Sequence, residues 1–410
     1  MGEGAVKYLI IGGGAAAAQA AVGIRELDAD GSVTIVAKES WWPYDRPPLS
    51  KGMLLGQAEP ADAESKDPSW YEKNNVTVKR GVEAVSLDTA AREVDFSDDS
   101  TLKYDRLLIA TGATPNNPPI PGIDLKGVHL FRTADDSLAV REALKSAKSA
   151  VMVGAGYIGM EVASGCVEQG VAVTIVEPTE YPWSRSVSPL TGNFIKSYFE
   201  SKGAKFRMGE LVAGFEGDGS VSSVVLKSGE RIAADLVVVG VGVHLNVDLA
   251  KGAGLPLDPK HGVVVNEQLR TQDPDVFVAG DVAAFQDVNL GYRWHAEHYL
   301  NARWQGKQAG RNMAGANENY DQIPYFFSDM LDIHMVLRGD PNGGKSVGAI
   351  GDVDAAEFVE LYAREDGTLA MGLGFSKNEK LLDPIADKLE ELYRQKAKVE
   401  GLTKQDFGLE

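Results

Sequence analysis

The stretch VMVGAGYIGMEVASGCVEQGVAVTIVE, residues 151–177, decides how this chain is expected to fold. An apolar run leads into Gly154, Gly156 and Gly159 at the spacing G-x-G-x-x-G, and a helical segment and a second apolar run end at Glu177. The glycines permit, in turn, a tight turn out of a strand, close approach of the backbone to a pyrophosphate, and close packing of helix on strand. Amide groups at the helix start can hold phosphates, and an acid about 20 residues further on suits the two ribose hydroxyls of an adenosine. The stretch therefore predicts a βαβ unit that binds a dinucleotide.

The same pattern occurs near the N-terminus. Residues 6–11 are apolar, and Gly12, Gly14 and Ala17 follow at the same spacing, with alanine acceptable at the third place. A second apolar run, residues 32–37, is followed closely by Glu39. Two complete modules in one chain indicate two dinucleotides held face to face, and the usual reason for that arrangement is hydride transfer between nicotinamide and flavin.

Length, charge and cysteine content narrow the class of protein. A chain of 410 residues is too long for one core and suits two or three domains. The formal net charge of −18 argues against nucleic acid as a main partner, because phosphate binding needs a basic footprint. Cys166 is the only cysteine, so no intrachain disulfide can form, and no apolar run is long enough to span a bilayer. We expect a cytoplasmic protein.

The order of the apolar runs predicts the domain organisation. Residues 262–266 and 276–281 read as strands that return to the first module after the second one has ended. Residues 358–364 and 368–375 read as a hairpin, and residues 378–399 as a helix. The expected fold class is therefore α/β, with two Rossmann-like dinucleotide-binding domains, one inserted in the other, and a small C-terminal α+β domain. The predicted boundaries are 1–117 with 245–323 for the first domain, 118–244 for the second and 324–410 for the third.

Six motifs in order carry a resemblance to a known family. They are WWPYDRPPLSK (41–51), LLIATG (107–112), GAGYIGME (154–161), GVG (240–242), VFVAGD (276–281) and PYFFSD (324–329). With these the chain resembles the FAD-dependent pyridine-nucleotide reductases of the ferredoxin and rubredoxin reductase type. That group also includes the apoptosis-inducing factor and monodehydroascorbate reductase. The resemblance covers nearly the whole chain and implies FAD and NAD(H) as cofactors.

The resemblance also assigns roles to individual residues. It implies that the first module holds FAD and that the second holds NAD(H). The residues implied for FAD are Gly12, Gly14, Ala17, Glu39, Arg46, Lys51, Thr111, Gly112, Arg132, Gly280, Asp281, Glu297, His298 and Phe327, of which Glu297 and His298 match a segment near the flavin pyrimidine and the nicotinamide. The residues implied for NAD(H) are Gly154, Gly156, Gly159, Glu177, Arg185 and Gly242. The two implied catalytic residues are Lys51, with its ammonium near flavin N5, and Glu161, which matches the family acid that pairs with this lysine.

The chain departs from related reductases at a few positions. His244 and Leu245 replace a frequent Arg-Pro, and Tyr299 and Phe327 stand where tryptophan is frequent. The single cysteine excludes a redox-active cysteine pair as the catalytic relay. No metal site is predicted, because the histidines lack partners at the spacing of metal ligands.

The predicted function is the passage of electrons from NADH through FAD to a one-electron acceptor. A small acidic carrier such as a ferredoxin or rubredoxin is the expected partner, and Arg303, Lys307 and Arg311, at i, i+4 and i+8, are its predicted docking row. Two alternatives stay open. One is a redox-responsive FAD- and NAD-binding protein like the apoptosis-inducing factor, and the other is a reductase of a small-molecule acceptor, quinone- or monodehydroascorbate-like. The oligomeric state is open, with a homodimer as one alternative.

Overall fold

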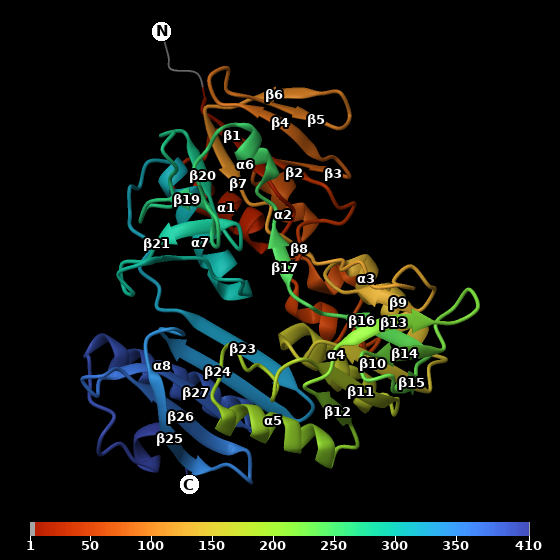
Figure 1. Cartoon of the computed structure of the whole chain (residues 1–410). Coiled ribbons are helices and arrows are strands. Elements are labelled where there is room, and N and C mark those ends of the chain that lie inside the picture. Colours follow the sequence, from red (N-terminus) through yellow and green to blue (C-terminus); the bar gives the residue numbers. More distant parts are fainter. Residues whose placement is uncertain (1–4, 410) are drawn as a thin grey trace. The chain divides into compact units, whose positions relative to one another are not determined.

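The computed structural model describes residues 5–409, and the chain divides into two compact units (Figure 1). The first unit contains the chain up to Pro47, then Glu59–Thr114 and Val243–Gln322. The second contains Pro48–Ala58, Pro115–Gly242 and the chain from Ile323 onward. The first dinucleotide module thus resumes after the second one ends. The finer division into three domains stays a prediction.

A parallel five-stranded sheet forms the centre of the first unit. Its strands, in order across the sheet, are β20 (Val276–Val278), β7 (Arg106–Ile109), β1 (Lys7–Ile11), β2 (Ser32–Ala37) and β3 (Val76–Arg80). All neighbouring pairs are parallel. Leu9, Ile10 and Ile35 are buried, as expected for strands covered on both faces.

Two helices of this unit pack together unusually closely. They are α1 (Ala15–Arg25), which follows β1, and α7 (Tyr299–Met313). A Cβ added at Gly306 would lie 2.2 Å from the Ala16 carbonyl oxygen, and one at Gly310 would lie 2.1 Å from the Ala20 carbonyl oxygen. Only glycine fits at these two contacts, and this close packing fixes α7 against the helix that follows the first glycine fingerprint.

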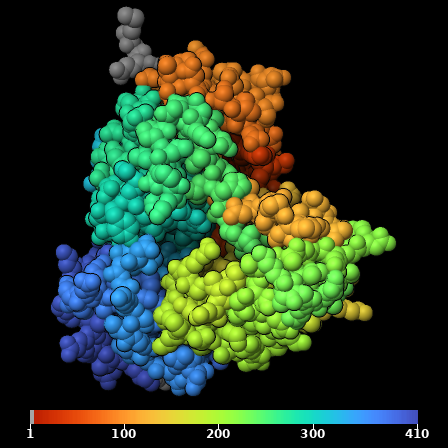
Figure 2. Space-filling view, viewed as in Figure 1, coloured from red at the N-terminus to blue at the C-terminus, as the bar shows by residue number. Residues whose placement is uncertain are grey.

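The remaining elements of the first unit are short. The antiparallel sheet of β4 (Ala84–Asp88), β5 (Glu93–Phe96) and β6 (Thr101–Lys103) lies at the surface, where its orange atoms are visible in Figure 2. A second small sheet contains β18 (Leu257–Asp258), β19 (Gly262–Val265), β21 (Ala283–Gln286) and β22 (Arg293–Trp294), and β8 (Ala113–Pro115) pairs with β17 (Val243–Leu245). The short helices are η2 (Pro60–Ala63), α2 (Pro68–Lys73) and α6 (Asp248–Gly252), and η1 (Pro47–Ser50) lies at the passage into the second unit.

The second unit repeats the design of the first. Its parallel sheet has the order β12 (Lys205–Met208), β11 (Ala172–Glu177), β10 (Ser149–Val153), β16 (Leu236–Val239) and β9 (Val128–Leu130). The helices along this part of the chain are α3 (Ala134–Leu144), α4 (Tyr157–Glu168) and α5 (Pro189–Ser201), and β13 (Val212–Glu216), β14 (Ser223–Leu226) and β15 (Arg231–Ala233) form an antiparallel sheet. The predicted α/β class with two Rossmann-like modules is confirmed.

The C-terminal part of this unit is an antiparallel sheet with one amphipathic helix. The strand order is β23 (Tyr325–Met330), β24 (Ile333–Gly339), β27 (Leu369–Ser376), β26 (Glu357–Ala363) and β25 (Lys345–Asp352). The helix is α8 (Leu382–Arg394), and η3 (Glu379–Leu381) and η4 (Lys404–Phe407) are single turns. The predicted hairpin is confirmed as β26 and β27.

The predicted helix over residues 378–399 is shorter at both ends. A 3₁₀ turn precedes α8, and the helix then starts so that Pro384 falls in its first turn, where the missing N–H costs no hydrogen bond. Lys396 has a φ of +50°, a left-handed conformation that ends the helix.

Candidate functional site

The glycine fingerprint of the second unit has the geometry that a dinucleotide needs. Gly154 has a φ of +105°, and a Cβ there would lie 2.3 Å from the Gly240 carbonyl oxygen. A Cβ at Gly159 would lie 2.3 Å from the Gly154 carbonyl oxygen, so helix and strand loop can touch only through glycine. At Gly156, by contrast, a Cβ would meet nothing within 4 Å. The open side of the loop is therefore at the glycine whose backbone is expected to approach the pyrophosphate.

The fingerprint of the first unit has the same geometry. Gly12 has a φ of +140°, and a Cβ there would lie 2.2 Å from the Ala110 carbonyl oxygen. At Gly14 a Cβ would meet nothing within 4 Å, and Ala17 at the third place is fully buried. Both modules thus leave space at the same position, and the space is not filled by the protein itself.

The helix that follows each fingerprint starts in a way that suits an anion. Gly14 caps α1 and Gly156 caps α4, so neither helix has a side chain that bonds to its first amide groups. Neither first turn contains an acid. The first amide groups of a helix have no partners within the helix, and its dipole favours negative charge there. The residues present therefore fit a dinucleotide phosphate at both places.

Each module has a carboxylate after its second strand: Glu177 ends β11 beside the glycine loop of the second unit, and Glu39 lies two residues after β2 in the first. Glu177 accepts a hydrogen bond from the Ala155 amide at 2.7 Å and one from the Thr179 hydroxyl at 2.9 Å. Glu39 accepts from the Tyr44 hydroxyl at 2.6 Å and pairs with Arg46 at 3.3 Å. These partners fix both carboxylates where a ribose is expected.

Arg46 connects two of the residues predicted for FAD. Burial lowers the pKa of its guanidinium, but Tyr44, Glu39 and Asp281 raise it by more, so the net pKa lies above its usual value. The charge of Asp281, a buried residue, thus acts on Arg46 and helps to keep its guanidinium protonated. Gly280, which precedes Asp281 in the chain, has a φ of +82° and donates its amide to the buried side chain of Gln305 in α7.

Further residues predicted for FAD form hydrogen bonds within the first unit. Thr111 donates its hydroxyl to the Asn246 carbonyl at 2.8 Å, and Gly112 accepts from the Asn246 amide at 2.9 Å. Glu297 lies 2.9 Å from Nε2 of His295, and His298 is the N-cap residue of α7.

The lysine expected near the flavin forms its ion pair with Asp329. Nζ of Lys51 lies 2.6 Å from Oδ2 of Asp329 in β23 and 5.1 Å from the ring centre of Phe327. Phe327 and Asp329 share one face of β23, because side chains alternate along a strand. The expected direct pair with Glu161 is thus replaced by a pair with Asp329.

Glu161 is buried and is hydrogen-bonded to the residues that precede Lys51 and Asp329 in the chain. Ser50 donates to Oε2 of Glu161 at 2.5 Å, and Ser328 donates to Oε1 at 2.7 Å. Ser50 precedes Lys51 and Ser328 precedes Asp329, so the carboxyl group holds the two segments that carry the ion pair. Burial raises the pKa of Glu161, and the lowering effects of Lys51 and the two hydroxyls do not fully offset it.

The predicted docking row on α7 is neutralised by acids. Lys307 pairs with Glu26 at 2.8 Å, and Arg311 pairs with Glu26 and with Glu318 at 2.9 and 2.7 Å. Arg303 donates to the Tyr299 hydroxyl at 2.7 Å and lies 3.9 Å from Asp45. The row exists, but acids from other segments accompany each cation.

Comparison with known proteins identifies the family. A family model described as pyridine nucleotide-disulphide oxidoreductase matches residues 6–306, which include both glycine fingerprints. The chain belongs to this family. The prediction of an FAD-dependent pyridine-nucleotide reductase is therefore confirmed, and with it FAD and NAD(H) as cofactors.

Individual reductases resemble the chain over most of its length. A rubredoxin-NAD(+) reductase of Pseudomonas putida is 32% identical, over 85% of this chain and 88% of the relative. The peroxisomal monodehydroascorbate reductase 4 of Arabidopsis thaliana is also 32% identical, over 95% and 86%. The crystal structure of a ferredoxin reductase for the CYP199A2 system from Rhodopseudomonas palustris superimposes with a TM-score of 0.86 at 30% identity, covering 90% of this chain and 91% of that one.

The family name refers to a disulphide, but this oxidoreductase has no pair of cysteines that could form one. Its single cysteine, Cys166, is buried in α4, and burial raises the pKa of the thiol to about 12. A thiol with so high a pKa is not a thiolate at neutral pH and is not a nucleophile.

Not all predicted site residues belong to one unit. Lys51, Arg132, Arg185 and Phe327 belong to the second unit, as do the residues predicted for NAD(H), whereas the other residues predicted for FAD belong to the first. The Arg132 amide donates to Asp136 at the start of α3. The joint role of both sets toward one FAD stays a prediction.

Several residues around the site were not found by sequence reasoning. Asp329, Ser50 and Ser328 lie inside motifs that were read for other residues. His334, assigned no role, lies 2.7 Å from Asp329. Tyr157, next to Gly156, contacts the rings of Trp183 and Phe326 at centre distances of 4.4 and 4.1 Å. The sequence signal that could have identified Tyr157 is its position directly after the second glycine of the fingerprint.

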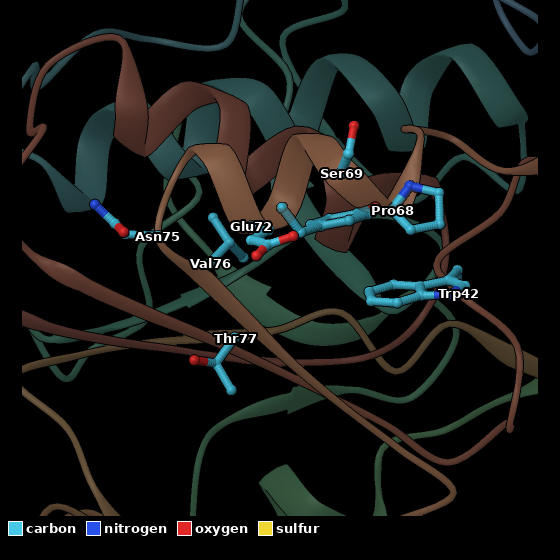
Figure 3. Close-up of a pocket in the computed structure, with 8 residues that line it drawn as sticks. Trp42, Pro68, Ser69, Glu72, Asn75, Val76 and Thr77 are labelled. Atoms are coloured by element: carbon cyan, nitrogen blue, oxygen red, sulfur yellow. The ribbon is translucent and has the colours of Figure 1, made fainter.

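Other features of the described residues lie apart from this site. A pocket beside α2 and β3 in the first unit includes no predicted site residue, and it is lined by Trp42, Pro68, Ser69, Tyr71, Glu72, Asn75, Val76 and Thr77 (Figure 3). Among residues 5–409, no cluster of histidine, cysteine and acidic side chains is arranged to hold a metal ion. Within the same range, no helix has the length and apolarity needed to cross a membrane.

Proposed function

We propose that this oxidoreductase transfers electrons from NADH through FAD to a small acidic iron–sulfur or iron carrier, a ferredoxin or rubredoxin. The observation that carries the proposal is the combination of two dinucleotide modules with one buried cysteine. Without a thiol relay, electrons leave from the flavin directly, and this suits an acceptor that is itself a redox protein. Relatives named as reductases of rubredoxin and ferredoxin support this class of acceptor.

The proposal gives each part of the chain a task. Gly14, Glu39, Arg46 and Asp281 bind FAD, while Gly156 and Glu177 bind the nucleotide that reduces it. Bound there, FAD would supply the chemistry that links hydride transfer from NADH to one-electron transfer to the acceptor. Lys51, held by Asp329, supplies positive charge where the reduced flavin becomes negative.

The experiment that tests the proposal is stopped-flow reduction by NADH followed by reoxidation with a panel of acceptors. We expect a yellow protein with one non-covalently bound FAD, rapid reduction by NADH, and fast reoxidation by a ferredoxin or rubredoxin. Reoxidation that is slow with every protein acceptor, but fast with ferricyanide, contradicts the proposal.

A small-molecule acceptor is the second candidate. It is favoured by the monodehydroascorbate reductase relative, which matches 95% of this chain. In the same panel, fast reoxidation by monodehydroascorbate or a quinone, with slow reoxidation by the iron proteins, selects this candidate. Slow turnover with every acceptor selects a redox-responsive binding protein instead.

Location and assembly complete the proposal. The cytoplasmic location and the homodimer stay predictions. The first is supported by the use of a single, buried cysteine.

A further inference from the structure

Three side chains of the second unit form a continuous polar chain. Nζ of Lys51 lies 2.6 Å from Oδ2 of Asp329, and Nδ1 of His334 lies 2.7 Å from the other oxygen, Oδ1. One carboxylate therefore joins the lysine to the histidine, and each of its oxygens has its own partner. All three side chains are partly exposed rather than buried.

The backbone of a β-hairpin places His334 opposite Asp329. The two residues are directly paired in the register of β23 and β24, so their side chains lie on the same face. The turn between the strands is fixed from outside, because the Leu331 amide donates to the Ser164 hydroxyl of α4 at 2.6 Å. Asp332, in the same turn, accepts from the Tyr198 hydroxyl of α5 at 2.7 Å. The histidine is thus presented on a rigid support.

The direction of the hydrogen bond follows from the charge of the aspartate. Burial raises the pKa of Asp329, but Lys51 and His334 lower it by more, and the net pKa lies below the usual value. An ionised carboxylate only accepts hydrogen bonds, so Nδ1 of His334 carries the proton and donates it. With Oδ1 held in this way the carboxylate cannot rotate freely, and Oδ2 stays directed at the lysine.

We propose that His334 is a positioning residue for Lys51, acting through Asp329. A lysine side chain is a flexible stem with a point charge at its end, so a fixed carboxylate determines where that charge lies. The inference rests on the proposed function, in which this charge faces the flavin. It adds that the position of the charge depends on a residue outside the reacting groups.

The test measures the lysine itself as well as the reaction. Competitive acetylation of the flavin-loaded protein, read by mass spectrometry, gives the reactivity of Lys51 relative to the exposed Lys145. We expect His334→Leu to raise this reactivity roughly threefold or more, because a hydrogen bond to a charged group is lost, and to slow NADH-driven flavin reduction by a similar factor. His334→Asn, whose amide nitrogen lies at about the position of Nδ1 and also donates, should keep both values near those of the unchanged protein. Asp332→Asn is the matched control, since it alters the same hairpin without touching Asp329.

Each outcome decides one part of the inference. Unchanged Lys51 reactivity in His334→Leu overturns it, and so does an equal change in Asp332→Asn, which would mean that any loosening of the hairpin suffices. Raised reactivity with unchanged flavin reduction also overturns it, provided that Lys51→Ala slows reduction. If Lys51→Ala leaves reduction unchanged too, the proposed role of the lysine fails instead. His334→Gln, whose amide lies away from the Nδ1 position, asks the same question if the leucine variant folds poorly.

Discussion

At the scale of single residues, the site is built as two layers that share their backbone segments. The buried layer is Ser50–Glu161–Ser328, and the outer layer is Lys51–Asp329–His334. Ser50, the last residue of η1, and Lys51, which follows it, contribute one side chain to each layer, as do the adjacent residues Ser328 and Asp329 of β23. If a side chain in one layer is changed, the other layer is affected through the backbone that joins Ser50 to Lys51 and Ser328 to Asp329, rather than through a hydrogen bond between the layers.

This layering predicts coupling between Lys51 and Glu161. Lys51→Ala and Glu161→Ala should each slow flavin reduction by NADH, and the double variant should lose less than the sum. Since the two groups share a network and attract each other, we expect a coupling energy of about 0.5–3 kcal/mol in a double-mutant cycle. Strict additivity would show that the layers act independently.

The buried carboxyl group also predicts a dependence of stability on pH. Because the folded-state pKa of Glu161 lies above the ordinary value of 4.5, the folded protein binds this proton more tightly than the unfolded chain. The stability from this group is therefore present at low pH and is lost as pH rises through the folded-state pKa. Glu161→Gln has no such loss, so its Tm relative to the unchanged protein should increase as pH rises above the ordinary value of 4.5 and through the folded-state pKa.

The control for this measurement is Glu180→Gln, which removes an exposed carboxylate from the segment after β11. Its Tm difference should stay nearly constant over the same range. A constant difference for Glu161→Gln as well would mean that the buried group does not titrate there.

Glu177 predicts the choice of nucleotide. The carboxylate can bind both ribose hydroxyls but repels a 2′-phosphate, and the nearest following cation in the chain is Arg185. Loss of one charge-assisted contact weakens binding roughly tenfold or more. We therefore expect kcat/KM to be higher for NADH than for NADPH by a factor of about ten or more. Glu177→Gln should narrow this ratio, and equal values for both nucleotides in the unchanged protein would refute the assignment.

At the scale of elements, the close contact between α1 and α7 holds in place the helix that follows the first fingerprint. Gly310→Ala places a methyl group where the Ala20 carbonyl oxygen lies, so the helices must separate. We expect a loss of about 1–3 kcal/mol in the free energy of unfolding, measured with denaturant, together with weaker FAD retention. Gly252→Ala in α6, where a Cβ meets nothing within 4 Å, is the matched control and should be neutral or slightly stabilising. Equal effects of the two substitutions would show that the helix contact is not tight.

The same elements show what a sequence can and cannot predict. The two fingerprints were readable because their glycines, helix and acid lie within about 30 residues of one another, as in any βαβ unit. The ion pair of Lys51 was not readable, because Asp329 lies 278 residues away and is brought near by the fold of the second unit. Likewise, the cations of α7 are visible at helical spacing, but Glu26, 285 residues from Arg311, is not.

At the scale of the whole molecule, net charge predicts the response to salt. With −18 overall and the α7 row paired with acids, the protein should repel an acidic carrier at long range. Such repulsion is screened over about 10 Å at 0.1 M ionic strength, so reduction of a ferredoxin should speed up as salt is added from low concentration. Lys307→Glu should leave the ratio of ferredoxin to ferricyanide reduction nearly unchanged. If the rate of ferredoxin reduction instead falls steeply as salt is added, the carrier binds to a basic surface other than the α7 row.

The path of the chain has a consequence for biosynthesis. The polypeptide passes from one unit to the other after Pro47, Ala58, Thr114, Gly242 and Gln322. A ribosome therefore releases β1, β2 and β3 long before β20 and α7, which complete the same sheet and its helix packing, have been translated. The first unit is complete only once Gln322 has been translated, and the second also needs the chain from Ile323 onward, so neither can be expressed alone as an uninterrupted fragment. Nascent chains stalled near residue 240 should accordingly be open to proteases in both halves, and protection should arrive late, after the last strands emerge.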